Sequence, residues 1–209
     1  MTARKQESAD RQNGFPRDAA GRCRGCWLLL LTISILVLAA DLTSKQAAFQ
    51  HVAGQPITID KQQVLAETFT LPPHRGIEII PRILDLKLVV NRGAVFGVGH
   101  GGRWFFAGFT IVALFAALAM FAGWMKRSER MAQVSVALIL AGGMGNLYDR
   151  IVFACVRDFL HLFPSTRLFP WVFNIADASL LFGIGLLMIH FWRKDRRLAK
   201  ERSAQTKGR

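Results

Sequence analysis

Two aspartates are candidates for chemistry because neither has a basic partner at helical spacing. Asp158 follows a long apolar stretch, and Asp177 lies near the start of the next stretch, three residues after Asn174. Two carboxyl groups at a partly dry site share one proton, because both cannot ionise there. The ionised partner can activate water, while the protonated partner stabilises the oxyanion and donates to the leaving amine. The pair therefore suggests aspartic protease chemistry, although a solvated loop carboxylate (Asp158) and a polar helix-packing residue (Asp177) are the simpler interpretations.

Other charged residues interrupt the apolar stretches. Asp41 and Lys45 lie four residues apart, hence on one face of a helix, and predict a local ion pair; a functional role for Lys45 stays open. Asp149 precedes Arg150, and we expect a structural ion pair between them that keeps Asp149 ionised. Ser44 precedes Lys45, but neighbours on a helix point about 100° apart, so a Ser/Lys protease dyad is a weak alternative.

Small and polar residues form a stripe just before these charges. Gly142, Gly145 and Asn146 recur at spacings of three and four, as do Asp149 and Arg150 after them. Small residues let another helix approach closely, and Asn146 can hydrogen-bond across the gap. The stripe therefore predicts a close contact between helices.

Four apolar stretches must position these side chains. They cover about residues 27–48, 104–124, 131–151 and 171–192. Each is long enough to cross a bilayer core of about 30 Å. The first also resembles a cleavable signal peptide, but its helical pattern continues to Ala48 and three further stretches follow, so we expect it to be retained. The sequence predicts an all-α membrane protein with four transmembrane helices.

The charge distribution predicts how the helices are oriented. The formal net charge is +13, but the basic residues gather in the two tails and between the second and third apolar stretches. We therefore expect no nucleic-acid partner and interpret the charge as topology. Basic segments favour the cytoplasmic side. Both termini are predicted to be cytoplasmic, with residues 49–103 and 152–170 facing outward and the two aspartates at the outer surface.

The remaining segments complete the predicted organisation. Residues 1–25 are typical of a disordered cytoplasmic tail, residues 26–192 of one transmembrane domain, and residues 193–209 of a basic cytoplasmic tail. In the outer loop 49–103, apolar and mostly polar residues alternate from Leu84 to Val90, which predicts a half-buried strand.

The cysteines predict no disulfide framework. Their number is odd, and Cys23 and Cys26 fall in the predicted cytoplasmic tail. The pair has the spacing of half a zinc site, but no second Cys or His pair completes it. We expect neither a metal site nor a function for these two cysteines.

Together the motifs resemble the lipoprotein signal peptidase family, also called signal peptidase II. Four blocks match in order: Asp41 to Lys45, Asn91 to Gly97, Gly142 to Arg150, and Val156 to Phe159 continuing to Phe173 to Asp177. The second block departs from the family, because Ala94-Val95 replaces the usual double alanine and Arg92 is bulky. Residues from about 54 to 76 also look longer than in many relatives.

The resemblance implies a membrane aspartic endopeptidase of the bacterial inner membrane. Such an enzyme removes the signal peptide from diacylglyceryl-modified prolipoproteins by cutting before the lipidated cysteine. The resemblance implies that the enzyme uses no metal or cofactor. It also implies contact with membrane lipid and a small antiparallel sheet outside the membrane. We further expect a monomer. The catalytic aspartates would be Asp158 and Asp177. The positions that shape or support the site would be Asn91, Gly93, Asn146, Arg150 and Asn174, with Asp41, Lys45 and Asp149 structural.

Two other functions stay open on the sequence. A four-span carrier could use Asp41, Lys45, Asp149 and Asp177 as a proton relay, but a relay needs ionisable groups along the whole crossing, and these gather in the outer third. A relative that binds lipidated substrates without cleaving them would have no need for both Asp158 and Asp177.

Overall fold

The computed structural model describes residues 18–93, 102–164, 166 and 171–207. Its helices are η1 (Ala20–Arg22), α2 (Arg24–His51), α3 (Lys61–Leu65), α4 (Gly102–Ala119), the π-helix η2 (Met120–Trp124), α5 (Arg130–Val152) and α6 (Ile175–Lys207). Its strands are β1 (Ile77–Ile80), β2 (Leu84–Asn91), β3 (Val156–Leu162) and β4 (Val172–Phe173). The predicted tail up to residue 17 and residues 94–97 of the second motif lie outside the described residues.

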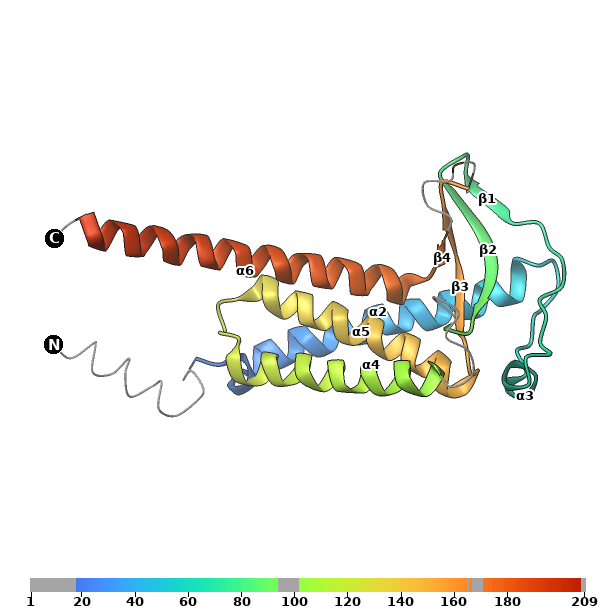
Figure 1. The fold of residues 1–209 in the computed structure, drawn as a ribbon, viewed down its shortest axis with the longest axis horizontal. Helices are drawn as coiled ribbons and strands as arrows, with labels where there is room; N and C mark the ends of the chain where they lie inside the picture. The colour runs from blue at the N-terminus through green and yellow to red at the C-terminus, as the bar shows by residue number, and fades with distance from the viewer. Residues whose placement is uncertain (1–17, 94–101, 165, 167–170, 208–209) are drawn as a thin grey trace.

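Four helices lie side by side along the long axis of the molecule (Figure 1). Within the described residues, α2, α4 with η2, α5 and α6 are long and apolar enough to cross a membrane, which confirms the predicted number of spans. Most of α5 is buried among the other three helices. The others expose large apolar side chains such as Leu28, Phe109 and Phe182. Such surfaces are stable against lipid rather than water.

Glycines let α5 pack closely against its neighbours, as their spacing predicts. A Cβ atom at Gly142 would overlap the backbone oxygen of Ala176 and lie 2.8 Å from Cγ of Leu180, both on α6. A Cβ atom at Gly145 would overlap the carboxylate of Asp41 on α2. These two positions therefore set how near α5 comes to the two helices that carry the polar residues of the first and last motifs.

A four-stranded antiparallel sheet in the order β1-β2-β3-β4 lies at one end of the helices, opposite the start of α2 and the end of α6 (Figure 1). Strand β2 confirms the predicted strand at 84–90 and pairs with β3 through Val89 and Asp158 among others. Strand β4 adds Phe173 opposite Leu160. The sheet thus joins the connection between α2 and α4 to the connection between α5 and α6.

The long connection after α2 is tied to this sheet and to α5. Arg92 donates to the backbone oxygen of Phe69 at 2.5 Å, and Lys61 donates to the backbone oxygen of Ile151 at 2.7 Å. His74 accepts a hydrogen bond from the backbone N–H of Leu88 at 3.1 Å. Arg92, which departs from the family motif, therefore anchors the segment 54–76, which looks longer than in relatives, to the end of β2.

The last helix differs from its prediction at both ends. A span was predicted at 171–192, but α6 starts at Ile175, because Val172–Phe173 pairs with β3 as β4. The helix continues to Lys207, through residues predicted as a tail. Residues 193–207 contain neither Gly nor Pro and are rich in good helix formers, so nothing stops the helix at the end of its apolar part.

Candidate active site

The start of α6 is built by a reciprocal pair of hydrogen bonds between Asn174 and Asp177. Asn174 Oδ1 accepts from the backbone N–H of Asp177 at 2.9 Å, and Asp177 Oδ2 accepts from the backbone N–H of Asn174 at 3.3 Å. This is a capping box with Asn and Asp in its two positions. Asp177 is therefore in the first helical turn, where the helix dipole favours a negative charge. The prediction placed it six residues into a helix.

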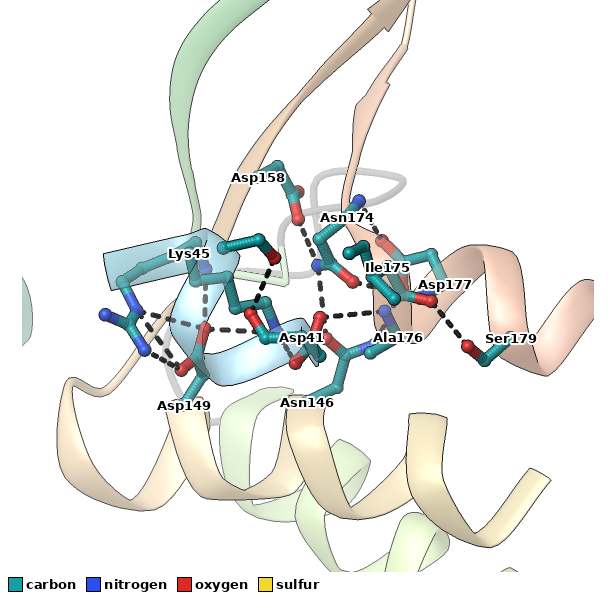
Figure 2. Close-up of polar contacts among 12 residues, drawn as sticks. Asp41, Lys45, Asn146, Asp149, Asp158, Asn174, Ile175, Ala176, Asp177 and Ser179 are labelled. Carbon is teal, nitrogen blue, oxygen red and sulfur yellow. Dashed lines mark hydrogen bonds and ion pairs between the residues drawn. The ribbon is translucent and has the colours of Figure 1, made fainter. Parts of the chain in front are cut away.

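Asn174 also contacts the second candidate aspartate. Its Nδ2 donates to Asp158 Oδ1 at 2.6 Å and to Asn146 Oδ1 at 3.2 Å. Asn146 in turn donates through Nδ2 to Asp177 Oδ1 at 2.7 Å. The two asparagines thus connect both carboxyl groups in one network, in which strand β3, helix α5 and the start of α6 meet (Figure 2).

Asp158 reaches the network from the middle of the sheet. Its side chain is 1% exposed, and its Oδ2 accepts from Asn91 Nδ2 on β2 at 3.1 Å. Burial, followed by the negative charge of Asp177, raises the pKa of Asp158 to about 7, although the hydrogen bonds from Asn91 and Asn174 act in the opposite direction. A carboxyl group with this pKa is close to half protonated at neutral pH.

A buried cluster of four charged residues lies beside the network. Lys45 Nζ is 2.7 Å from Asp41 Oδ2 and 3.4 Å from Asp149 Oδ2, and it donates to Asn146 Oδ1 at 3.2 Å. Arg157 Nη2 pairs with Asp149 Oδ1 at 2.8 Å. The two cations balance the two carboxylates, as a buried cluster requires. Lys45 also fixes the Asn146 amide, so that its nitrogen faces Asp177.

The cluster confirms one predicted ion pair and corrects another. Asp41 and Lys45 pair as their spacing predicts, and Asp41 Oδ1 also accepts from the backbone N–H of Ala176 at 2.8 Å. Asp149 was expected to pair with Arg150, but its ion pairs among the described residues are with Arg157 and Lys45. Neighbours on a helix diverge, whereas β3 returns Arg157 to the end of α5.

Gly93 and Arg150 lie beside the network, and both lie next to the ring of Phe106. Gly93 has a φ of +83°, which side-chain-bearing residues rarely adopt, and a Cβ atom there would lie 3.3 Å from the Phe106 ring. The Arg150 guanidinium lies over the same ring, 5.8 Å from its centroid, and donates to the backbone oxygen of Asn146 at 3.2 Å. Asn91 holds the turn, because its Oδ1 accepts from the backbone N–H of Gly93 at 2.9 Å.

Sequence reasoning missed the helix cap and the partner of Asp149. The pattern Asn-x-x-Asp before an apolar run is a signal for a helix start at Asn174, but the aromatic residues before it were assigned to the helix. The side chain of Arg157 was expected only to point away from Asp158. It does so, and it also donates to Gln46 Oε1 at 3.2 Å and lies 4.3 Å from the Phe153 ring centroid.

The arrangement bears on metal binding and on the proton relay considered from the sequence. In the part of the chain that the structure describes, no three His, Cys, Asp or Glu side chains gather in a way that could hold a metal ion. The buried charged residues of that part all belong to the site, namely Asp41, Lys45, Asp149, Arg157 and Asp158. The other end of the helices has an apolar core around Leu30, Phe121 and Val136. A relay of charges across the whole span is therefore not supported.

Comparisons with known proteins agree with this site. The family described as Signal peptidase (SPase) II matches residues 33–193. A lipoprotein signal peptidase of Ectopseudomonas mendocina (strain ymp) is 34% identical over 174 residues, which cover 81% of this chain and 89% of that protein. One from Geobacillus kaustophilus (strain HTA426) is 39% identical over 145 residues, with coverages of 69% and 93%.

A solved structure extends the similarity to the fold. It is described as a bacterial membrane enzyme, and it superposes with a TM-score of 0.61 at 28% identity over 79% of this chain and 88% of that one. A second such structure gives a TM-score of 0.60, also at 28% identity, over 78% of this chain and 91% of that one. With four candidate membrane spans and a match over most of its length, this chain belongs to the signal peptidase II family of lipoprotein signal peptidases.

Proposed function

We propose that this protein is a membrane aspartic endopeptidase that removes the signal peptide from diacylglyceryl-modified prolipoproteins and cuts before the lipidated cysteine. The observation that carries the proposal is the contact of one residue, Asn174, with both carboxyl groups. Its Nδ2 donates to Asp158 Oδ1, and its backbone N–H donates to Asp177 Oδ2. Family membership supports the substrate class, and the joining of buried Asp158 and half-buried Asp177 in one hydrogen-bond network supports the aspartic mechanism.

The surroundings of the two aspartates favour different protonation states. Asp177 accepts from Asn146 and from the backbone N–H of Asn174, and it lies in the first turn of α6, where negative charge is favoured. Asp158 has a pKa raised to about 7, first by burial and then by the charge of Asp177. We assign the shared proton at rest to Asp158. Asp177 then removes a proton from the attacking water, and Asp158 stabilises the oxyanion and protonates the leaving amine.

The other residues of the network have supporting roles in this proposal. Asn91 and Asn174 hold Asp158, while Asn146 holds Asp177 and is itself oriented by Lys45. Gly93 and Arg150, which flank the Phe106 ring, shape the approach to the site. Asp41, Lys45, Asp149 and Arg157 form the charged support behind these asparagines.

The proposed location of the site matches the chemistry of the substrate. We place the sheet and the two aspartates at the outer face of the bacterial inner membrane and both termini in the cytoplasm, because basic residues gather before the first span, between the second and third spans, and after the fourth. A diacylglyceryl group keeps a cysteine in the outer leaflet, so the bond before it lies at the membrane surface. We further propose that the protein acts as a monomer in contact with lipid and without a cofactor.

The test is cleavage of a purified diacylglyceryl-modified prolipoprotein by the wild type, Asp158→Asn and Asp177→Asn, followed by gel shift and by mass analysis of the new N-terminus. We expect each variant to lose at least about 10³-fold in cleavage rate, since each removes a proton-transfer group. The wild-type product should begin at the lipidated cysteine.

The matched control is Asp195→Asn, an exposed aspartate on the far part of α6, which should cleave at the wild-type rate. Each variant is also melted in detergent, because Asp177 caps α6. Retained cleavage by a folded Asp158→Asn or Asp177→Asn protein would refute the aspartic mechanism. A wild type that binds the substrate without cutting it would favour the binding-only relative.

A further inference from the structure

Cys23 and Cys26 lie at the end of the molecule opposite the proposed active site. Cys23 is the N-cap residue of α2, with extended backbone angles, and Cys26 is in the first turn of that helix. The backbone N–H of Cys26 donates to the backbone oxygen of Cys23 at 3.0 Å. A turn closed by such a bond brings the first and fourth Cα atoms within about 7 Å, near the range that a disulfide spans.

The two side chains are neighbours at the start of α2, where interaction with the Cys26 side chain is the main influence on the Cys23 thiol. Because both residues lie in one closed turn, little backbone movement is needed to join their sulfurs. Both cysteines are free in this structure.

The two cysteines differ in exposure and reactivity. Cys23 is partly exposed, whereas Cys26 is fully buried in the apolar core with Phe121. The hydrogen bond from Cys26 lowers the pKa of the Cys23 thiol, and the positive charge of Arg127 acts in the same direction. A thiolate at a helix N-terminus is also stabilised by the helix dipole. An accessible, acidic thiol followed three residues later by a buried thiol has the features of an attacking and a resolving cysteine.

We propose that Cys23 and Cys26 are a redox modification site, in which a peroxide oxidises the dithiol to an intramolecular disulfide. The Cys23 thiolate attacks one peroxide oxygen, the O–O bond breaks, and after proton transfer Cys23 is a sulfenic acid and one water has left. The Cys26 thiol then attacks the Cys23 sulfur, the S–O bond breaks, and a second water leaves with the Cys26 proton. Two thiols and one hydrogen peroxide thus give one disulfide and two waters. A dithiol reductant reverses the reaction by thiol–disulfide exchange.

The third cysteine is an internal reference for this reaction. Cys155 is 1% exposed and follows α5 at the sheet end, away from the pair. Burial, followed by the charge of Asp149, raises the pKa of the Cys155 thiol to about 12. Its thiol is therefore protonated and inaccessible near neutral pH, and it should not react at peroxide concentrations that oxidise Cys23.

The experiment uses the full-length purified protein in detergent, reduced, freed of reductant and treated with increasing hydrogen peroxide. Remaining thiols are then labelled with a polymer-linked maleimide after denaturation. We expect two of the three thiols to be lost together, a mass decrease of two hydrogen atoms, and a peptide cross-link between Cys23 and Cys26 that a dithiol reductant removes.

Three single variants make the outcome specific. Cys155→Ser should leave the reaction unchanged, and Cys23→Ser should leave Cys26 labelled. Cys26→Ser should let a sulfenic acid accumulate at Cys23, where a dimedone probe traps it. The proposal is overturned if all three thiols oxidise in parallel, if cross-links form only between chains, or if Cys23 proceeds to sulfinic acid with Cys26 still reduced. Because thiols are read directly, failure here does not bear on the proposed protease function.

Discussion

At the scale of single residues, Asn146 and Asn174 decide how the two aspartates differ. Asn146 Oδ1 receives donors from Lys45 and Asn174, so its Nδ2 is left to donate to Asp177. Its amide therefore has one favourable orientation, with the positive end toward Asp177. Asp158 receives amide donors too, but it is buried among strands rather than placed in the first turn of a helix. The network thus supports one proton being held on Asp158.

This assignment predicts the alkaline side of the pH–rate profile. Because the protonated form of Asp158 is the acid, kcat/KM should fall about tenfold per pH unit above the pKa of Asp158, which is about 7. The hydrogen bond from Asn91 lowers that pKa, so Asn91→Ala should raise it and move the decline to higher pH. The measurement is kcat/KM from about pH 5 to pH 9 for both proteins.

A structural role for Asn91 would lower kcat/KM equally at every pH and leave the midpoint of the decline where it is in the wild type. An unmoved midpoint in a folded Asn91→Ala protein would therefore contradict the assignment of the proton to Asp158. Melting curves across the same pH range separate loss of fold from loss of the acid.

At the scale of elements, helix α5 is the support on which the site is assembled. It is mostly buried, and it places Asn146 against α6 and Asp149 against β3. The glycines that let α6 and α2 come close, Gly142 and Gly145, lie four residues and one residue before Asn146. The distance between helices therefore sets whether the hydrogen bonds of the site can form at all.

This predicts a large effect from one added methyl group. Gly142→Ala should lower the free energy of unfolding by about 1–3 kcal/mol, because the new Cβ atom meets the Ala176 backbone and α6 must move. Cleavage should fall as well, since Asn146 and Asp177 would separate. Melting temperature and cleavage rate are measured in the same detergent.

Gly108→Ala is the matched control for this prediction, because nothing lies within 4 Å of a Cβ atom at that position on α4. It should melt at or slightly above the wild-type temperature, as alanine is the better helix former. Equal melting temperatures and cleavage rates for the two alanine variants would mean that the contact between α5 and α6 does not determine the site.

The elements also show what could be predicted from the sequence. The long helices and β2 follow from local patterns, namely sustained apolar runs and alternation at 84–90. Strand β4 depends on pairing between Phe173 and Leu160, which no local pattern reports. The start of α6 does have a local signal, the capping pair Asn174 and Asp177. The contacts of the site divide in the same way into local ones, which spacing predicts, and long-range ones, which it does not. Spacing placed Asp41 with Lys45 and Asn174 with Asp177, whereas the ion pair between Arg157 and Asp149 exists only because β3 turns back.

At the scale of the whole molecule, the buried charges and the largest apolar cluster lie at opposite ends. The sheet, the buried charges and the two candidate catalytic aspartates are together, while the start of α2 and the end of α4 with η2 enclose the apolar cluster around Phe121 (Figure 1). Exposed apolar side chains cover the length between the two ends. The basic segments around the spans support the proposed orientation, in which these segments face the cytoplasm.

The orientation predicts opposite labelling of two exposed lysines. In a variant whose native cysteines are replaced by serine, Lys87→Cys on β2 should react with a membrane-impermeant maleimide in cells with a permeable outer envelope and an intact inner membrane. Lys200→Cys on α6 should react only after the inner membrane is opened. The reverse pattern would place the proposed active site in the cytoplasm, and labelling of both from outside would refute the four-span topology.

The capping box at the start of α6 constrains how this protein can evolve. Asp177 is both the proposed base and the residue of the first helical turn that completes the capping box with Asn174. A lineage that no longer needed the protease would therefore still be selected to keep a hydrogen-bond acceptor at this position. Loss of Asp158 carries no such penalty, because it relieves the burial of an ionisable group. Inactive descendants should therefore lose the aspartate of the strand first and retain that of the helix.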